Sequence, residues 1–100
     1  LNVLLLDPLL EDTIRGAIQR LPSGSYLALD PETSQDIIAA VRREVDQHQD
    51  GSRPVILTSL EIRRFVKRLC ETEVPDLAVV SYQELSPELQ IQPVARIHVG

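Results

Sequence analysis

Four of the ten basic residues of this chain lie within six consecutive positions. They are Arg63, Arg64, Lys67 and Arg68. Their spacing of i, i+1, i+4 and i+5 places them on one face of a helix. The chain has a net charge of −5, and the part outside these four cations carries −9. Like charges on one face repel each other unless an acidic surface opposes them, so these four residues are the predicted partner-binding residues.

A simpler interpretation of the same face is a solvated helix surface. Lys67 and Glu71 have the i,i+4 spacing of a helical ion pair. Exposed pairs of this kind contribute little to stability. The basic face is therefore either a docking surface or an ordinary exposed surface, and the sequence leaves both open.

Two aspartates, Asp7 and Asp30, each follow a short apolar run and resemble the acidic residues of a receiver-like phosphotransfer domain. Each is also followed directly by proline, as at Asp7-Pro8. An aspartate before a proline is typical of a helix start, where the carboxylate accepts a free backbone N–H. We favour helix capping, and a receiver-like phosphotransfer signalling domain is the alternative function.

Other reactive side chains form no recognisable catalytic set. Thr58 and Ser59 lie outside a G-x-S-x-G motif, and neither His48 nor His98 has a clear role as their base. The four glycines are scattered, so there is no phosphate-binding loop. The lone Cys70 excludes an intramolecular disulfide and is expected to be buried. The sequence predicts no catalytic residue, no cofactor, no metal site and no enzyme activity.

Length and composition predict one folded domain over residues 1–100, because 43% of the residues are apolar and 25% are charged. The net negative charge argues against binding to nucleic acid. The longest apolar run has four residues, 3–6, too few to cross a bilayer. Since there is no methionine at position 1 or elsewhere, we expect the chain to start inside a longer reading frame.

The elements that position these residues alternate between strand and helix patterns. Strands are expected at 3–6, 26–29, 54–58, 77–82 and 94–99, and helices over 8–21, over 31–45 and from Ser59 to about 70. The polar stretch 46–53 is a predicted loop, and residues 86–88 are predicted to form a turn or a helical turn. Pro93 cannot donate to a ladder, which predicts that the last strand lies at a sheet edge. Ser59 is expected to cap the third helix.

This alternation predicts an α/β fold, since parallel strands need long crossovers that are usually helical. We expect three helices packed on a four- to five-stranded sheet, mostly parallel or mixed.

Several segments together resemble the type III secretion export-gate family. They are residues 54–59, 62–67, 75–85 and 91–97, in that order, with the Asp-Pro helix starts at 7 and 30. The Ser-Tyr-Gln-Glu run at 81–84 and the Ile-Gln-Pro run at 91–93 are more similar to the injectisome branch than to the flagellar branch. The resemblance covers nearly the whole chain.

The resemblance implies that this chain is the last cytoplasmic α/β subdomain of a larger inner-membrane protein, anchored only through an N-terminal region of membrane helices. It implies a location at the cytoplasmic face of the bacterial inner membrane, and a function in protein export and virulence. Members of the family assemble into a nonameric ring with copies of themselves. They receive secretion chaperone–substrate complexes, and they contact a gatekeeper protein and the stalk protein of the export ATPase.

Overall fold

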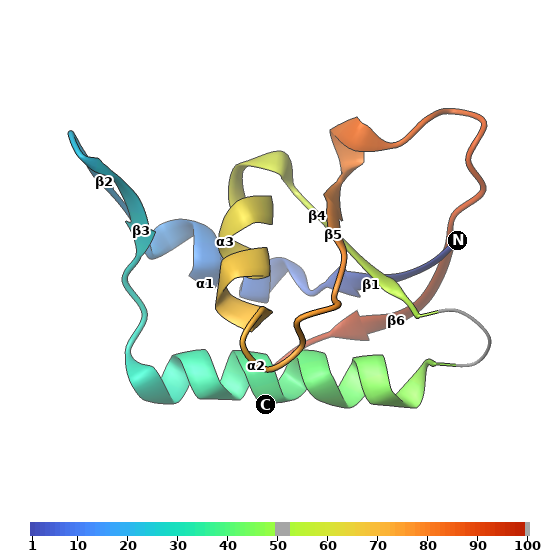
Figure 1. Ribbon diagram of the computed structural model, residues 1–100, viewed down its shortest axis with the longest axis horizontal. Coiled ribbons are helices and arrows are strands. Elements are labelled where there is room, and N and C mark those ends of the chain that lie inside the picture. The colour runs from blue at the N-terminus through green and yellow to red at the C-terminus, as the bar shows by residue number, and fades with distance from the viewer. Residues whose placement is uncertain (50–52, 100) are drawn as a thin grey trace.

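The computed structural model describes residues 1–49 and 53–99. In chain order its elements are β1 (Asn2–Leu6), α1 (Pro8–Gly16), β2 (Ile18–Leu21), β3 (Gly24–Leu27), α2 (Pro31–Gln47), β4 (Val55–Thr58), α3 (Leu60–Cys70), β5 (Val79–Ser81), the 3-10 helix η1 (Tyr82–Glu84) and β6 (Gln92–Ile97). Figure 1 shows α2 along the lower side of the molecule, with α3 above it and in front of α1. Residues 50–52, in the predicted loop, lie outside the described residues, and α2 continues to Gln47.

Four strands form a parallel sheet in the order β5-β4-β1-β6. The central strand β1 is buried on both faces, because Val3 and Leu4 are each fully inaccessible to solvent. In the register, Leu4 pairs with Ile56 of β4 and with Ala95 of β6. The predicted α/β class, with three helices on a four-stranded parallel sheet, is confirmed.

Strand β6 lies at the sheet edge, as Pro93 predicted. Its register against β1 shifts between Val3, which pairs with Pro93, and Leu4, which pairs with Ala95. A proline that cannot donate to the ladder is tolerated at such an irregularity and at an edge. The strand begins at Gln92 and ends at Ile97, so its bounds lie two residues before those expected.

The first predicted helix is too long. Helix α1 ends at Gly16, and residues 18–21 form strand β2, which pairs antiparallel with β3. Glycine weakens a helix, and the Ala17 carbonyl accepts the Ala28 N–H at 2.8 Å, which starts the hairpin ladder. The side chains of Ile18 and Leu27, which pair across the ladder, pack against the core.

The expected strand at 26–29 is therefore not part of the sheet. It lies in a separate two-stranded hairpin that projects away from the sheet at the left of Figure 1. A two-residue turn, Pro22-Ser23, connects the strands, and Gly24 after it has a φ of 134°, which an L-residue side chain rarely adopts. This local turn chemistry overrides the apolar spacing that favoured a continuous helix.

Both predicted Asp-Pro helix starts are confirmed. Asp7 accepts the Leu9 N–H at 3.0 Å, and Asp30 accepts the Thr33 N–H at 2.7 Å. Pro8 and Pro31 are the first residues of α1 and α2. In each case the missing proline N–H leaves no unpaired donor.

All three helices bury an apolar face in one core with the sheet. The buried side chains of α3 are Ile62, Phe65, Val66 and Cys70, and Leu69 is partly buried and packs against the core. None of the helices in the described ranges has the length and apolar character needed to cross a bilayer.

We expect Gly24→Ala to destabilise the protein by about 1–2 kcal/mol, because it forces a side chain onto a backbone with φ of 134°. Gly16→Ala is the matched control: it too meets open space but has no positive φ, so its free energy of unfolding should stay within about 0.5 kcal/mol or rise slightly. Urea unfolding of both variants measures the difference. Equal losses would contradict this account of the turn.

Candidate protein-docking surface

The two aspartates of the receiver-like alternative do not meet at one sheet edge. Asp7 follows the sheet strand β1, whereas Asp30 follows the separate hairpin, outside the sheet. Both carboxylates are engaged in capping. Bonds from the Thr33 N–H and from its hydroxyl lower the pKa of Asp30. Helix capping is the role that this geometry supports for both carboxylates, and the pairing that motivated the alternative is absent.

Thr58 and Ser59 serve packing and helix contacts. Thr58 is fully buried, and its hydroxyl donates to the Ser59 carbonyl at 3.1 Å. Ser59 has the extended backbone of an N-cap, but the predicted side-chain cap is wrong. Its hydroxyl and its N–H instead donate to the two carboxylate oxygens of Glu11, at 2.9 and 3.2 Å. The Ser59 hydroxyl thus donates to Glu11 and accepts from Arg15, both on α1, instead of accepting a first-turn N–H of α3.

Arg15 connects α1 to the start of α3. Its guanidinium donates to Asp12 at 2.7 Å, to Glu61, and to the Ser59 hydroxyl at 3.2 Å. The hydrogen bond to Glu61 raises the pKa of Arg15, and the charges of the nearby carboxylates add to the effect. The sequence reasoning missed this network. The only local signals were the helical spacings of Glu11 and Asp12 to Arg15 within α1, because Ser59 and Glu61 are more than forty positions away.

Cys70 is fully buried on the inner face of α3, as predicted. Burial raises the pKa of its thiol to about 11, partly opposed by the charge of Lys67. His48 follows α2 as its C-cap, with its Nε2 at 3.6 Å from a Glu44 oxygen. His98 follows β6 and lies exposed, outside the strand in which it was expected. Across residues 1–49 and 53–99, no three ligand-type side chains lie together as a metal site.

The structure divides the basic face of α3 into two pairs. Arg63 and Lys67 are half-buried and are bonded within the domain. The Arg63 Nε lies 3.2 Å from a Glu84 oxygen. Bonds from Ser81 lower the pKa of Glu84, and Arg63 adds a smaller contribution. These contacts hold η1 against α3.

Lys67 has an internal role that the sequence did not reveal. Its ammonium donates to the carbonyl oxygens of Pro75 at 3.2 Å and Leu77 at 2.6 Å. The suggested pair with Glu71 is not formed; instead the cation binds the segment that leads from α3 into β5. Two of the four predicted docking residues therefore have structural partners.

Arg64 and Arg68 form the exposed pair, one helical turn apart. The Arg64 guanidinium carbon lies 4.8 Å from the centroid of the Phe65 ring. Arg68 borders a hollow of about 260 Å³ that also involves Tyr26 of the hairpin and Leu69. Within the described ranges, no carboxylate lies within ion-pair distance of either guanidinium. Two unpaired cations beside an apolar hollow can bind an acidic, partly apolar protein surface.

Comparison with known proteins identifies similar chains. A family model described as the FHIPEP family matches residues 1–90. "Low calcium response locus protein D" of Yersinia pestis is 42% identical over 94 residues, which are 93% of this chain and 13% of that protein. This chain thus spans about one eighth of that relative.

Solved structures share the fold. In the Chlamydia pneumoniae CdsV and CdsO complex, the matching chain is 48% identical, with a TM-score of 0.84 over 98% of this chain and 29% of that one. The nonameric SctV-C of EPEC is 33% identical, with a TM-score of 0.83 over 97% of this chain and 29% of that one. Each solved chain is more than three times as long as the matched region.

We expect Lys67→Met to destabilise the protein by about 1 kcal/mol, because it removes two charge-assisted bonds to the Pro75 and Leu77 carbonyls. Arg68→Met removes the same charge from the same helix and is the matched control, with little expected change. Chemical denaturation of both variants measures the difference. If they unfold alike, Lys67 does not have the assigned structural role.

The Cys70 thiol should resist alkylation in the native protein at pH 8 and react fully in urea, because it is buried and neutral. The folded pKa lies above the unfolded value of 9.0, so the native state favours the protonated thiol. The stability that this preference contributes is present below pH 9 and is lost as the pH rises from about 9 to 11. Cys70→Ala should lack that component of the pH dependence. Rapid native labelling would contradict the assignment.

Proposed function

This chain belongs to the FHIPEP family, the export-gate family of type III secretion, on its injectisome branch, and from that premise we propose that it is a non-enzymatic protein-docking subdomain of the gate. In the complete protein it contributes to a cytoplasmic ring that receives proteins for export. Membrane anchoring belongs to other parts of that protein, and this subdomain lies at the cytoplasmic face of the inner membrane.

Two relatives support the ring and the docking role. SctV-C of EPEC is nonameric, and its chain includes a region of this fold. CdsV of Chlamydia pneumoniae was solved in a complex with CdsO, a different protein. By analogy, this subdomain assembles with copies of itself through the complete protein and meets other proteins at its surface.

The observation that carries the docking proposal is the contrast within the basic face of α3. Arg63 and Lys67 have partners inside the domain, whereas Arg64 and Arg68 are exposed and have no carboxylate beside them in the described part of the chain. Holding two long cations one turn apart is unfavourable unless an acidic surface opposes them. The docking surface is therefore the exposed pair, which meets an acidic partner or a neighbouring copy in the ring.

The partners proposed for the complete protein come from the family. They are copies of the chain in a nonameric ring, chaperone–substrate complexes, the gatekeeper protein and the stalk protein of the export ATPase. Any of these with an acidic, partly apolar surface fits beside Arg64 and Arg68. None of the proposed contacts requires a cofactor, a metal or nucleic acid.

We expect Arg64→Glu/Arg68→Glu in the complete protein to weaken ring assembly or export at least tenfold, because it replaces attraction by repulsion at the docking surface. The free energy of unfolding should change by less than about 1 kcal/mol, since neither exposed side chain has an ion-pair partner. Secretion assays on cells and denaturation of the purified chain provide the two measurements.

Arg20→Glu/Arg96→Glu is the matched control, because both residues are exposed and the change in net charge is the same. This variant should assemble and export normally. Export that persists with Arg64 and Arg68 reversed would reject the surface. Equal loss in both variants would show an effect of total charge instead.

A further inference from the structure

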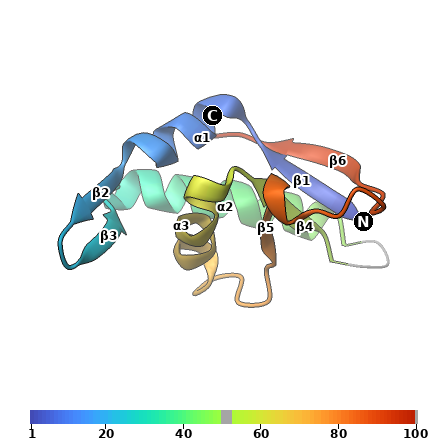
Figure 2. The ribbon, with the colours of Figure 1, turned by 90° about the horizontal axis from the view of Figure 1, so that it is seen from above.

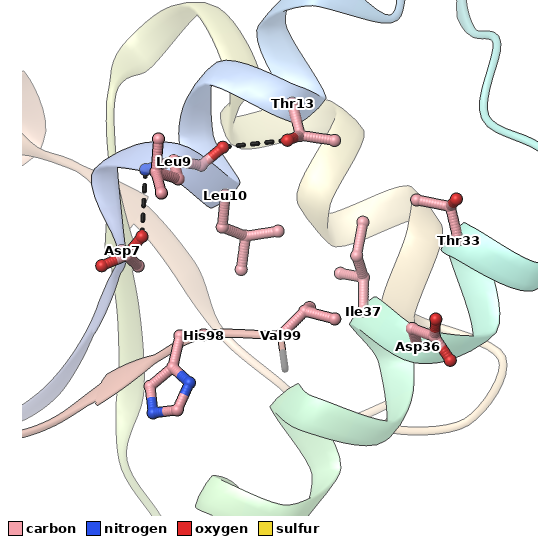
Figure 3. Close-up of a pocket in the computed structure, with 9 residues that line it drawn as sticks. All are labelled: Asp7, Leu9, Leu10, Thr13, Thr33, Asp36, Ile37, His98 and Val99. Carbon is pink, nitrogen blue, oxygen red and sulfur yellow. Dashed lines mark hydrogen bonds between the residues drawn. The ribbon is translucent and has the colours of Figure 1, made fainter.

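A second hollow opens where the start of α1, the start of α2 and the tail after β6 meet (Figure 3). We call it the α1–α2 groove; its apolar lining comes from Leu9, Leu10, Ile37 and Val99. Its volume is about 260 Å³, which is below the roughly 300–1,000 Å³ of typical small-molecule pockets. The groove is better matched to a protruding side chain than to a whole small molecule.

The groove exposes apolar surface at its sides. Leu9 is 76% exposed and Val99 46% exposed, whereas Leu10 and Ile37 at its base are almost fully buried. Figure 3 shows Leu10 and Ile37 facing each other across the opening, with Val99 between them and His98. An apolar side chain placed here would contact both the exposed and the buried members.

The rim of the groove is acidic. Asp7 and Asp36 line it, and one oxygen of Asp7 accepts the Leu9 N–H. In the described part of the chain, neither carboxylate has a cation within ion-pair distance. Arg43 and His98 border an adjoining hollow with Asp36, and the ion-pair partner of Arg43 is Glu44, at 3.5 Å. The groove therefore favours an apolar side chain accompanied by a cation.

The same chain carries that combination on α3. Leu60, Arg64 and Arg68 follow one another at i, i+4 and i+8, and all three are exposed, Leu60 by 52%. We call these three residues the α3 ridge. Successive positions on it are about 6 Å apart along the helix axis. In Figure 2, α3 extends from its start beside α1 toward the side opposite the C-terminus. Glu11 and Arg15, which contact the start of α3, do not line the groove, and no ridge residue lines it, so the ridge and the groove are separate surfaces of one copy.

We propose that the α3 ridge of one copy docks in the α1–α2 groove of the next, with Leu60 in the apolar opening and the arginines beside Asp7 and Asp36. The proposal rests on the proposed function, because it names the acidic surface that the exposed arginines meet. The two halves of the contact are different surfaces, so the arrangement is head-to-tail. Such contacts close into a ring when the rotation between copies fits.

A mixing experiment on the 100-residue chain tests the contact. Arg64→Glu/Arg68→Glu has a reversed ridge and an intact groove, and Asp36→Arg has an intact ridge and a reversed groove. We expect the unsubstituted chain to self-associate weakly at about 1 mM, and each variant alone to do so at least tenfold more weakly. An equimolar mixture should restore a contact of native strength, because the intact ridge of the Asp36→Arg variant can meet the intact groove of the Arg64→Glu/Arg68→Glu variant. Sedimentation measures association, and amide chemical shifts of Leu9 and Val99 locate it.

Two charge-matched controls accompany the mixture. Arg20→Glu/Arg96→Glu and Asp46→Arg change exposed residues outside the ridge and the groove, so both should associate as the unsubstituted chain does. The proposal is overturned if the unsubstituted chain shows no concentration dependence at 1 mM, or if the mixture stays monomeric. The proposal is also overturned if association changes amide chemical shifts away from the groove and leaves those of Leu9 and Val99 unchanged. If one of these results is obtained and reversal of Arg64 and Arg68 still abolishes export in the complete protein, the proposed docking function is retained. The acidic surface then belongs to a different partner.

Discussion

The structure depends on the burial of one face of α3 against the parallel sheet. Ile62, Phe65 and Val66 are almost fully buried in the core. Removing each of these side chains from water stabilises the folded state by roughly 1.5–3 kcal/mol. An exposed charge contributes at most about 1 kcal/mol. The apolar side therefore sets the rotation of the helix, and the positions of the basic residues follow from it. The same packing leaves Arg64 and Arg68 on the outside.

Polar contacts then hold both ends of this helix in place. At its start, Glu11 and Arg15 of α1 bind Ser59 and the first turn. Near its end, Lys67 binds the carbonyls that lead into β5. The contacts at the start join segments more than forty positions apart, and those near the end fix the connection from α3 into β5. Side chains and carbonyls from outside the helix therefore hold both of its ends, which suits docking, because less conformational freedom is lost when a partner binds.

The outcome of each prediction reflects how local its physical cause is. The Asp-Pro helix starts, the edge position of β6 and the burial of Cys70 were predictable, since each follows from a residue and its near neighbours. The end of α1 was not, because apolar residues at 14, 17, 18 and 21 fit a helix as well as a hairpin. The Ser59 cap was wrong for a related reason: Glu11 and Arg15 of another helix bind the Ser59 hydroxyl, and the sequence around Ser59 gives no sign of these contacts.

Composition, periodicity and capping residues by themselves determined an α/β domain and a helix with four cations on one side, because these depend on side-chain order along a single element. Only the tertiary structure decided which of the four cations are free to bind a partner. Arg63 and Lys67 look the same as Arg64 and Arg68 in sequence, yet Glu84 and the carbonyls near β5 reach only the first pair. The groove between α1 and α2 is likewise a product of packing, since its walls come from three segments that only the fold brings together.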